Sequence, residues 1–568
     1  MKNVVFILLR RLHLPLIVLI LVYAVSILGF VVIPGQDDQG NPWRMDFFHA
    51  FYFVSFMGST IGFGEIPYPF TGAQRMWASV TIYATVIAWL YGIGSLLSII
   101  QDPAFRQLIT ENTFRRAVRR MRDPFYLVGG YGDTGSQLVR SLVDAGFRVV
   151  VVDIDPERIN LLDLEDLGVF VPGLCADAAN PEVLEMAGLK LPNCIGVVAL
   201  TNHDHVNLMV AITTKLHDPR LPVIARAETS SAEANIASFG TEYIINPFEV
   251  FAEQLTLALH APGALLLQEW LAAAPHERLE EPLFPPHGKW ILCGYGRFGQ
   301  AIHRRFQAVD ESLVVVEVKP EKMRVPPGSI AGRGTEAHTL LEAGVEEAVG
   351  IIAGTNDDAD NLSIILTARE LNPDLFTVVR QNQRLNDAVF RAIHADLVMR
   401  RGDIIAHRIF SLIIAPLLEE FLEEAKRQGN AWANQLVARL SGLLGEEAPA
   451  IWEVELDRER APAVVAGIAE HGQLALEILL RDPRDREASL SCIPLYLWRG
   501  GRRELLPDGK MPLHPHDRIL FCGQPQALSQ MEWILQNRRV LHYIVTGEEL
   551  PGGWVWRKLN RREDSPAL

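Results

Sequence analysis

Two glycine-rich loops, GYGDTG at residues 130–135 and GYGRFG at residues 294–299, decide the fold of most of the chain. Each loop follows a short apolar strand and precedes a helical pattern, and the next strand ends at Asp153 or Glu317. In both places the acid lies 21 residues after the middle glycine. This spacing is typical of a dinucleotide-binding unit, in which pyrophosphate approaches a helix N-terminus and the acid accepts bonds from ribose hydroxyls.

The unit occurs twice along the chain. The two loops are 164 residues apart, and three later landmarks are each 154 apart: Thr201 and Thr355, Asn207 and Asn361, Arg226 and Arg380. Agreement at several landmarks indicates a duplication in which the second copy has lost about ten residues. Both copies alternate strands with helices, so the sequence predicts two doubly wound parallel sheets.

The composition points to a small membrane part joined to a large acidic body. The chain has 568 residues, of which 49% are hydrophobic, and 68 acidic against 53 basic residues give a net charge of −15. This composition is too apolar for a disordered protein, and the charge argues against nucleic acid as a partner. Five cysteines form no CxxC pair or zinc-type spacing, so we expect buried, reduced thiols.

Two uncharged runs predict membrane-spanning helices. Residues 14–33 and 76–101 carry no charge, and about 20 such residues suffice to cross the hydrocarbon core. Basic residues precede the first run and follow the second, so both termini are expected in the cytoplasm. The basic residues are Lys2, Arg10 and Arg11 before the first run, and Arg106, Arg115, Arg116, Arg119, Arg120 and Arg122 after the second.

The segment between the spans has the pattern of a re-entrant pore loop. Residues 47–57 read FFHAFYFVSFM, about three helical turns, and GSTIGFGE follows at residues 58–65. Non-helical backbone at membrane depth is tolerated where it lines a water-filled cavity. Gly62 and Gly64 permit conformations that turn successive carbonyls toward a common axis, where they can replace the hydration shell of a cation.

This pentapeptide resembles the selectivity-filter signature TVGYG of potassium channels. The resemblance implies that the carbonyls of residues 60–63 and the Thr60 hydroxyl coordinate potassium, and that four subunits close the ring. Phe63 replaces the usual tyrosine and Glu65 the usual aspartate, and neither change removes a carbonyl ligand. The predicted filter residues are Thr60, Ile61, Gly62, Phe63 and Gly64.

Gly92 and Gly94 lie inside the second span. Glycine in a membrane helix is commonly explained by helix packing, and the alternative is a gating hinge. With Leu97, these glycines are the candidate hinge and gate. The spans have no arginine-rich voltage sensor, so we do not expect gating by voltage.

The two glycine-loop copies resemble the RCK (TrkA-N) regulatory domains of prokaryotic potassium channels and transporters. The resemblance covers about residues 124–275 and 286–430, and it implies that the apolar segments 247–271 and 404–424 are exchanged between neighbouring domains. The expected domains are a pore (1–101), a solvated linker (102–123), two RCK domains (124–285 and 286–445), an α+β RCK C-terminal subdomain (446–530), and a tail (531–568).

The same resemblance implies two nucleotide sites. Their residues are Gly130, Gly132, Gly135, Asp153 and Asp177 in the first copy, and Gly294, Gly296, Arg297, Gly299 and Glu317 in the second. Asp133 in the first loop would repel pyrophosphate and Arg297 would attract it, whereas Asp177, on the adenine side, has no clear equivalent in the segment 332–336. The strand-ending acids favour NAD, AMP or ADP over a 2′-phosphorylated nucleotide.

We expect both copies to be occupied; the alternative is that one copy only dimerises. Calcium is a further candidate ligand, without named ligand residues. The sequence thus predicts a homotetrameric, nucleotide-gated potassium channel in the plasma (inner) membrane, in contact with lipid, and not an enzyme. A membrane-anchored NAD-dependent oxidoreductase would explain the loops but not the filter, and it lacks a catalytic His, Tyr or Lys constellation. A soluble regulatory subunit of a transporter would not carry a pore loop.

Overall fold

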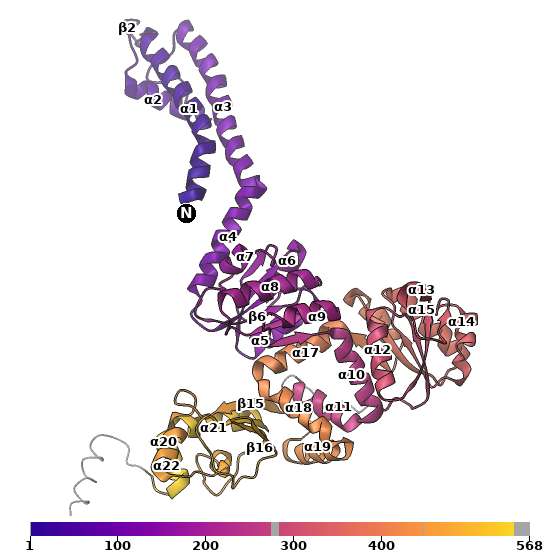
Figure 1. The fold of residues 1–568 in the computed structure, drawn as a ribbon. Helices are drawn as coiled ribbons and strands as arrows, with labels where there is room; N and C mark the ends of the chain where they lie inside the picture. Colours follow the sequence, from indigo (N-terminus) through magenta and orange to yellow (C-terminus); the bar gives the residue numbers. More distant parts are fainter. Residues whose placement is uncertain (1, 274–282, 446, 550–568) are drawn as a thin grey trace, which may run out of the picture. The chain divides into compact units, whose positions relative to one another are not determined.

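The computed structural model describes residues 2–273, 283–445 and 447–549 (Figure 1). It divides into two compact units, Met1–Met121 and Arg122–Leu568, which are described separately.

The first unit is built from two long apolar helices with a short helix between them. Its elements are α1 (Lys2–Val32), β1 (Gly35–Gln36), β2 (Pro42–Trp43), α2 (Phe47–Gly58), α3 (Gly72–Gln101) and α4 (Pro103–Arg120). Residues Leu12–Val32 and Gly72–Gln101 are long and apolar enough to cross a membrane. The rings of Phe30, Phe53 and Phe70 pack together in a core shared by the helices and the connecting segment.

The segment expected to be a solvated linker is largely helical. Helix α4 begins with Pro103, whose missing N–H is tolerated in a first turn. Arg119 and Arg120 lie in its last turn, where cations interact favourably with the helix dipole.

The second unit contains two parallel six-stranded sheets with the same strand order, which confirms the predicted duplication and the doubly wound fold. The orders are β5-β4-β3-β6-β7-β8 and β11-β10-β9-β12-β13-β14. The first sheet comprises β3 (Phe125–Gly129), β4 (Arg148–Asp153), β5 (Gly173–Cys175), β6 (Cys194–Ala199), β7 (Val223–Arg226) and β8 (Tyr243–Ile245). The second comprises β9 (Lys289–Cys293), β10 (Ser312–Glu317), β11 (Ile330–Ala331), β12 (Gly350–Ala353), β13 (Phe376–Gln381) and β14 (Leu397–Arg400).

Helices connect the strands of each sheet. In the first copy they are α5 (Asp133–Asp144), α6 (Pro156–Leu164), α7 (Pro181–Met186), α8 (Asp204–His217) and α9 (Ser230–Ala237). In the second they are α12 (Arg297–Ala308), α13 (Pro320–Met323), α14 (Ala337–Glu342), η1 (Val345–Glu347), α15 (Asp358–Leu371), η2 (Arg384–Asn386) and α16 (Asp387–Ala392). Asn207 donates to the carbonyls of Thr201 and Arg226 at 2.9 Å each, and Asn361 repeats these bonds in the second copy.

The two copies exchange helices, as the family resemblance implied. Helix α10 (Pro247–His260) follows the first sheet but packs on α12, and α17 (Arg401–Ile414) follows the second sheet but packs on α5 (Figure 1). Phe248 and Phe251 belong to the core of the second copy. Ile405 and Ile409 belong to the core of the first. Helices α11 (Pro262–Ala272), α18 (Pro416–Gln428) and α19 (Asn430–Leu444) share a further core.

The C-terminal part is a small α+β body. Its antiparallel sheet has the order β15-β18-β16-β17, in which β18 and β16 are the inner strands. The elements are β15 (Ala450–Glu455), α20 (Pro462–His471), η3 (Leu476–Leu480), β16 (Cys492–Arg499), β17 (Arg502–Leu505), β18 (Arg518–Gly523), α21 (Pro525–Gln536) and α22 (Arg538–Thr546). Trp533 of the predicted tail lies on α21, and Trp554 and Trp556 lie outside the described residues.

Four of the five cysteines are buried and none forms a disulfide. The expectation of burial is wrong for Cys175, which is exposed because it ends the outermost strand of the first sheet.

Candidate pore and nucleotide sites

The predicted filter follows the C-terminal end of α2. The Asp46 carboxylate accepts from the backbone N–H of His49 at 2.7 Å and caps the start of this helix. Beyond its end, Thr60, Gly62 and Gly64 have φ angles of 64°, 69° and 94°. The glycines were expected to provide this left-handed backbone, but Thr60 also adopts it, which is uncommon for a β-branched residue.

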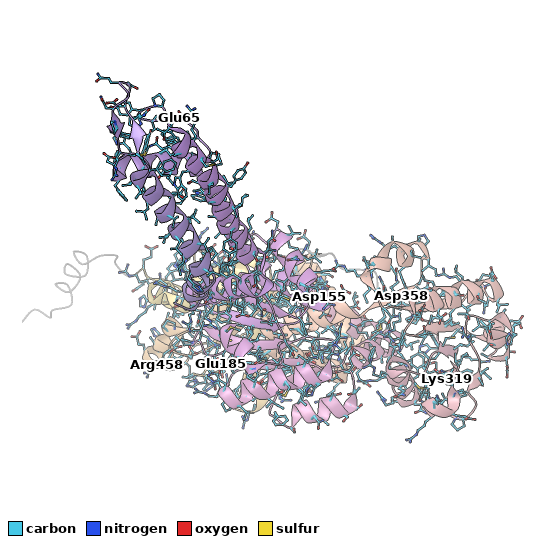
Figure 2. The ribbon with its side chains drawn as sticks, turned by 90° about the horizontal axis from the view of Figure 1, so that it is seen from above. Glu65, Asp155, Glu185, Lys319, Asp358 and Arg458 are labelled. Atoms are coloured by element: carbon cyan, nitrogen blue, oxygen red, sulfur yellow. The ribbon has the colours of Figure 1, made fainter. Side chains whose placement is uncertain are left out.

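An ion pair that was not predicted joins the end of the filter loop to helix α3. The Glu65 carboxylate accepts from Arg75 Nε at 2.8 Å and from the Phe70 backbone N–H at 2.8 Å. The hydrogen bond from Arg75 is the largest cause that holds the pKa of Glu65 below its usual range. Figure 2 shows Glu65 at one end of the pore unit. Arg75, a charged residue in the first turn of a membrane helix, was the available sequence signal.

The candidate hinge lies in an uninterrupted helix. A Cβ added to Gly92 or Gly94 would meet no atom within 4 Å, so packing inside the described part of the chain does not require either glycine. Gly94 and Leu97 line an open hollow with Ser98, Gln101 and Asp102. Contacts between subunits and helix bending therefore remain the two explanations for these glycines.

In both nucleotide loops the outer glycines are required by the protein itself. Gly130 has φ 106°, and a Cβ there would lie 2.9 Å from the Leu200 carbonyl carbon. A Cβ on Gly135 would lie 2.0 Å from the Gly130 carbonyl oxygen, and one on Gly299 would lie 2.1 Å from that of Gly294. These positions provide the tight turn and the close helix packing of a dinucleotide loop.

The middle glycines are different because the protein alone does not require them. Gly132 and Gly296 have φ angles of −79° and −70°, which any residue can adopt. A Cβ on Gly296 would meet nothing within 4 Å, and one on Gly132 would come only to 3.5 Å from Arg158 Nη1. Each is the N-cap of a helix without a side-chain cap, so the loops leave room and backbone donors for an anion.

The two strand-ending acids hold the glycine loops from inside the site. The Asp153 carboxylate accepts from the backbone N–H of Tyr131 at 2.5 Å and of Asp155 at 2.8 Å. Glu317 accepts from Tyr295 at 2.8 Å and Lys319 at 3.1 Å (Asp155 and Lys319 are labelled in Figure 2). Carboxylate oxygens can accept more than one bond, so ribose hydroxyls can still be bound.

The adenine-side position differs between the copies in charge. Asp153 is paired with Cys175 in strand register, and Glu317 with Ala331. Asp177 lies two residues after Cys175, and Arg333 lies two residues after Ala331. Arg333 is therefore the equivalent of Asp177 in the second copy. Asp177 accepts from the Ala179 backbone N–H at 2.8 Å and is exposed. The second copy therefore carries a cation where the first carries an acid.

The charges at the loops also differ from the sequence-based expectation. Arg297 Nη1 lies 2.7 Å from a carboxylate oxygen of Glu228, a buried residue of the first copy that also pairs with Arg226. In the first copy, Arg158 lies near Gly132 and 3.4 Å from Asp153. Asp133 and Arg297 therefore do not set the charge of the two loops alone, because Glu228 compensates Arg297 and Arg158 adds a cation near the first loop.

Glu228 and Arg158 were missed because their roles depend on tertiary contacts. Asp204 accepts from the Glu228 backbone N–H at 2.9 Å and fixes the loop after β7. Asp358 does the same in the second copy, where it accepts from the Asn382 backbone N–H at 2.7 Å. The position of Glu228, two residues after the repeated Arg226, was the only sequence signal.

Two families match the chain. The ion channel family matches residues 16–102, and the TrkA-N domain matches residues 126–247 and 290–401. The chain therefore joins an ion channel domain to two TrkA-N domains. Potassium channel protein 1 and probable potassium channel protein 2 of Methanocaldococcus jannaschii are 23% and 22% identical to it. In each case the match covers 42% of this chain and 68% of the relative.

One further relative matches a smaller part of the chain, and two solved structures match nearly all of it with TM-scores below 0.5. The glutathione-regulated potassium-efflux protein KefC of Klebsiella pneumoniae is 29% identical over 21% of this chain and 18% of its own. Among solved structures, a GsuK channel covers 93% of this chain and 99% of its own, with 16% identity and a TM-score of 0.47. A GsuK channel bound to NAD covers 94% and 99%, with 16% identity and a TM-score of 0.43. The family matches place the channel in a membrane.

Proposed function

We propose that this RCK channel is a potassium-selective homotetramer that opens or closes when adenine nucleotides bind its two glycine loops. The observation that carries the nucleotide part is the pair of middle glycines. Neither backbone conformation nor packing requires glycine at 132 or 296, whereas close approach of a pyrophosphate does.

The pore part rests on the filter segment. Ile61 and Phe63 are 60% and 64% exposed in the single chain, although both are large and apolar. Four copies around one axis would cover them and bring the carbonyls of residues 60–63 into a ring around a dehydrated potassium ion. The flanking arginines favour both termini and the RCK domains in the cytoplasm, with the channel in the plasma membrane.

The nucleotide class follows from the acids. Asp153 and Glu317 place carboxylates where a ribose 2′ group would bind, so NAD, ADP and AMP are accommodated and a 2′-phosphate is repelled. Arg158 and Arg297 supply cations to the two loops, so both copies can bind an anion. Calcium remains a further candidate regulator.

Gating would proceed through the contact between copies. Bound pyrophosphate would compete with Glu228 for Arg297, so occupancy of the second loop would loosen a contact to the first copy. The change would pass through the helical segment α4 to the inner end of α3. Gating requires only that the nucleotide bind one gate state more tightly than the other.

Flux in liposomes tests this proposal. Purified channel should pass potassium much faster than sodium, and NAD, ADP or AMP should change the rate whereas NADP should not. Parallel samples with calcium test the additional regulator. Equal sodium and potassium flux would refute selectivity, and flux that ignores every ligand would refute gating. Steady cofactor reduction without ion flux would instead support the oxidoreductase alternative.

A further inference from the structure

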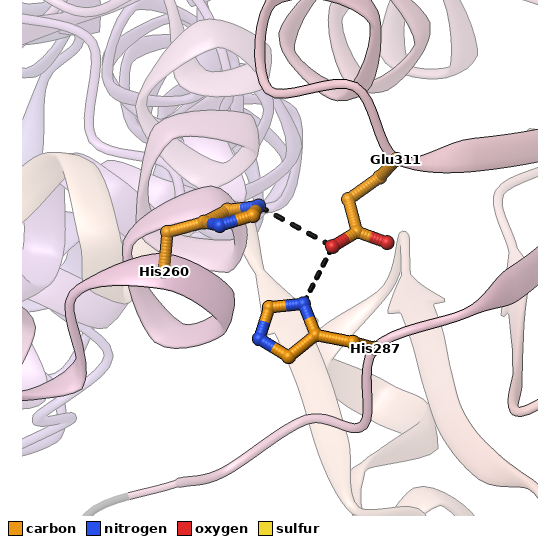
Figure 3. A group of neighbouring side chains, drawn as sticks. All are labelled: His260, His287 and Glu311. Carbon is orange, nitrogen blue, oxygen red and sulfur yellow. Dashed lines mark hydrogen bonds and ion pairs between the residues drawn. The ribbon is translucent and has the colours of Figure 1, made fainter.

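Two histidines and a glutamate, residue types that commonly bind metals, meet at a place that has no role in the proposed channel function. His260 is the last residue of α10, His287 precedes β9, and Glu311 precedes β10 (Figure 3). Their ligand atoms all lie within 4.8 Å of one another. Glu311 Oε1 is 2.6 Å from His287 Nδ1 and 3.4 Å from His260 Nε2.

The cluster lies at the opposite edge of the sheet from the nucleotide loop. Strands β9 and β10 are parallel; His287 lies two residues before β9, and Glu311 lies one residue before β10. The glycine loop and Glu317 come at the carboxyl ends of the same strands. A ligand at the cluster would therefore bind without contacting the nucleotide.

The arrangement is more than an imidazole–carboxylate ion pair. Two imidazoles face the same carboxylate oxygen, and their ring centroids are 5.0 Å apart. One hydrogen bond would satisfy a single histidine, but it does not explain the second ring. The Glu311 side chain is only 9% exposed, so its carboxylate is presented to the two rings rather than to bulk water.

The ligand types select the metal. Two imidazole nitrogens and one carboxylate oxygen suit a borderline-soft divalent ion such as Zn²⁺, with water in a fourth position. Calcium and magnesium prefer sets made of oxygen ligands. We propose that His260, His287 and Glu311 form a Zn²⁺ site that joins the exchanged helix α10 to the second sheet.

The consequence is local and mechanical. Helix α10 continues from the first copy but belongs to the core of the second. A metal held by His260 on this helix and by two residues at the strand ends would fix the C-terminal end of α10 against the sheet. Zn²⁺ should therefore raise the thermal stability of the second copy whether or not a nucleotide is bound.

The test uses the full channel after removal of any purification tag and treatment with EDTA. We expect calorimetric titration with ZnCl₂ to show one site per chain, and Co²⁺ to give the ligand-field absorption of a nitrogen–oxygen site. His287→Gln and His260→Gln should each weaken Zn²⁺ binding at least tenfold and abolish the rise in Tm. His338→Gln, an exposed histidine of the same copy outside the cluster, is the matched control.

Failure of the proposal would be unambiguous. Absence of Zn²⁺ binding by the wild-type channel, or equal binding by the two histidine variants and the control, would overturn it. A rise in Tm with calcium or magnesium that equals the rise with Zn²⁺ would refute the assigned metal class. If a histidine variant does not fold, Glu311→Gln removes the third ligand and tests the same site. Because the readouts are binding and Tm, they do not depend on channel gating.

Discussion

Arg297, in the second glycine loop, donates to the carboxylate of Glu228, in the first copy, across 2.7 Å. The partners differ greatly in exposure: the Glu228 side chain is 6% exposed and that of Arg297 is 51% exposed. The same carboxylate also pairs with Arg226, which is almost fully buried. Glu228 therefore links a buried charge of one copy to the phosphate loop of the other.

The first prediction concerns the unequal contributions of Glu228 and Arg297 to the free energy of unfolding. Glu228→Gln should lower the free energy of unfolding by about 3 kcal/mol, because it leaves the buried guanidinium of Arg226 without its anion. Arg297→Gln should lower it by less than about 1 kcal/mol, because an exposed cation is well solvated. Thermal or denaturant unfolding of the full channel measures both. Equal losses would contradict the assignment of Glu228 as a buried link.

The second prediction separates the roles of the glycines. Gly299→Ala should destabilise the second copy by about 3 kcal/mol or more, because its Cβ would lie 2.1 Å from a backbone oxygen. Gly296→Ala should leave Tm within a few degrees but weaken nucleotide binding at least tenfold. The measurement is Tm with and without NAD or ADP, and Gly132→Ala is the matched variant in the first copy. Unchanged binding in both middle-glycine variants would sink the proposed nucleotide sites.

The third prediction concerns pH at the outer end of the filter. The pKa of Glu65 is lowered chiefly by its hydrogen bond from Arg75, so the stabilising contact persists above the ordinary glutamate pKa. It is lost only as pH falls through the lowered pKa. Arg75→Gln should return this pKa toward its ordinary value and move the loss of current to higher external pH. Recordings at stepped external pH test this, with Arg44→Gln as the control in the same connecting segment.

The fourth prediction concerns the candidate hinge. Gly94→Ala adds a methyl group into open space and favours the helix by about 1 kcal/mol relative to glycine. If Gly94 is a hinge, open probability should change while the assembled channel keeps its size in gel filtration. Loss of assembly with normal opening in the remaining channels would instead assign Gly94 to packing between subunits. Gly72→Ala, in the first turn of the same helix and also in open space, is the control.

Features that depend on residues close together in the sequence could be predicted, and features that depend on contacts between distant segments could not. Glycine spacing and strand-ending acids are local patterns, so the two parallel sheets and the loops could be predicted from residues alone. The exchange of α10 and α17 came from family resemblance, because an apolar helix does not specify which core it joins. The equivalence of Arg333 and Asp177 could be recognised only from the strand register. The second copy lacks about ten residues before the later landmarks, so the positions do not align at a constant offset.

The contacts between distant segments could not be predicted. Glu228 and Arg297 are far apart in sequence, and nothing in either local pattern indicates that the two loops meet. The cluster of His260, His287 and Glu311 was missed for the same reason, because its members come from a helix end and two strand starts. Glu65 and Arg75 are only ten residues apart, but the sequence does not show that the chain turns back between them and brings the two side chains together.

The exchanged helices also have an evolutionary consequence. Because each copy completes the hydrophobic core of the other, neither half of the duplication can be deleted without exposing the remaining half to water. The two copies therefore pack together as two different subunits would, but they belong to one polypeptide. Because both copies lie in one polypeptide, they need not carry the same residue at equivalent positions, and they have an acid at 177 and an arginine at 333.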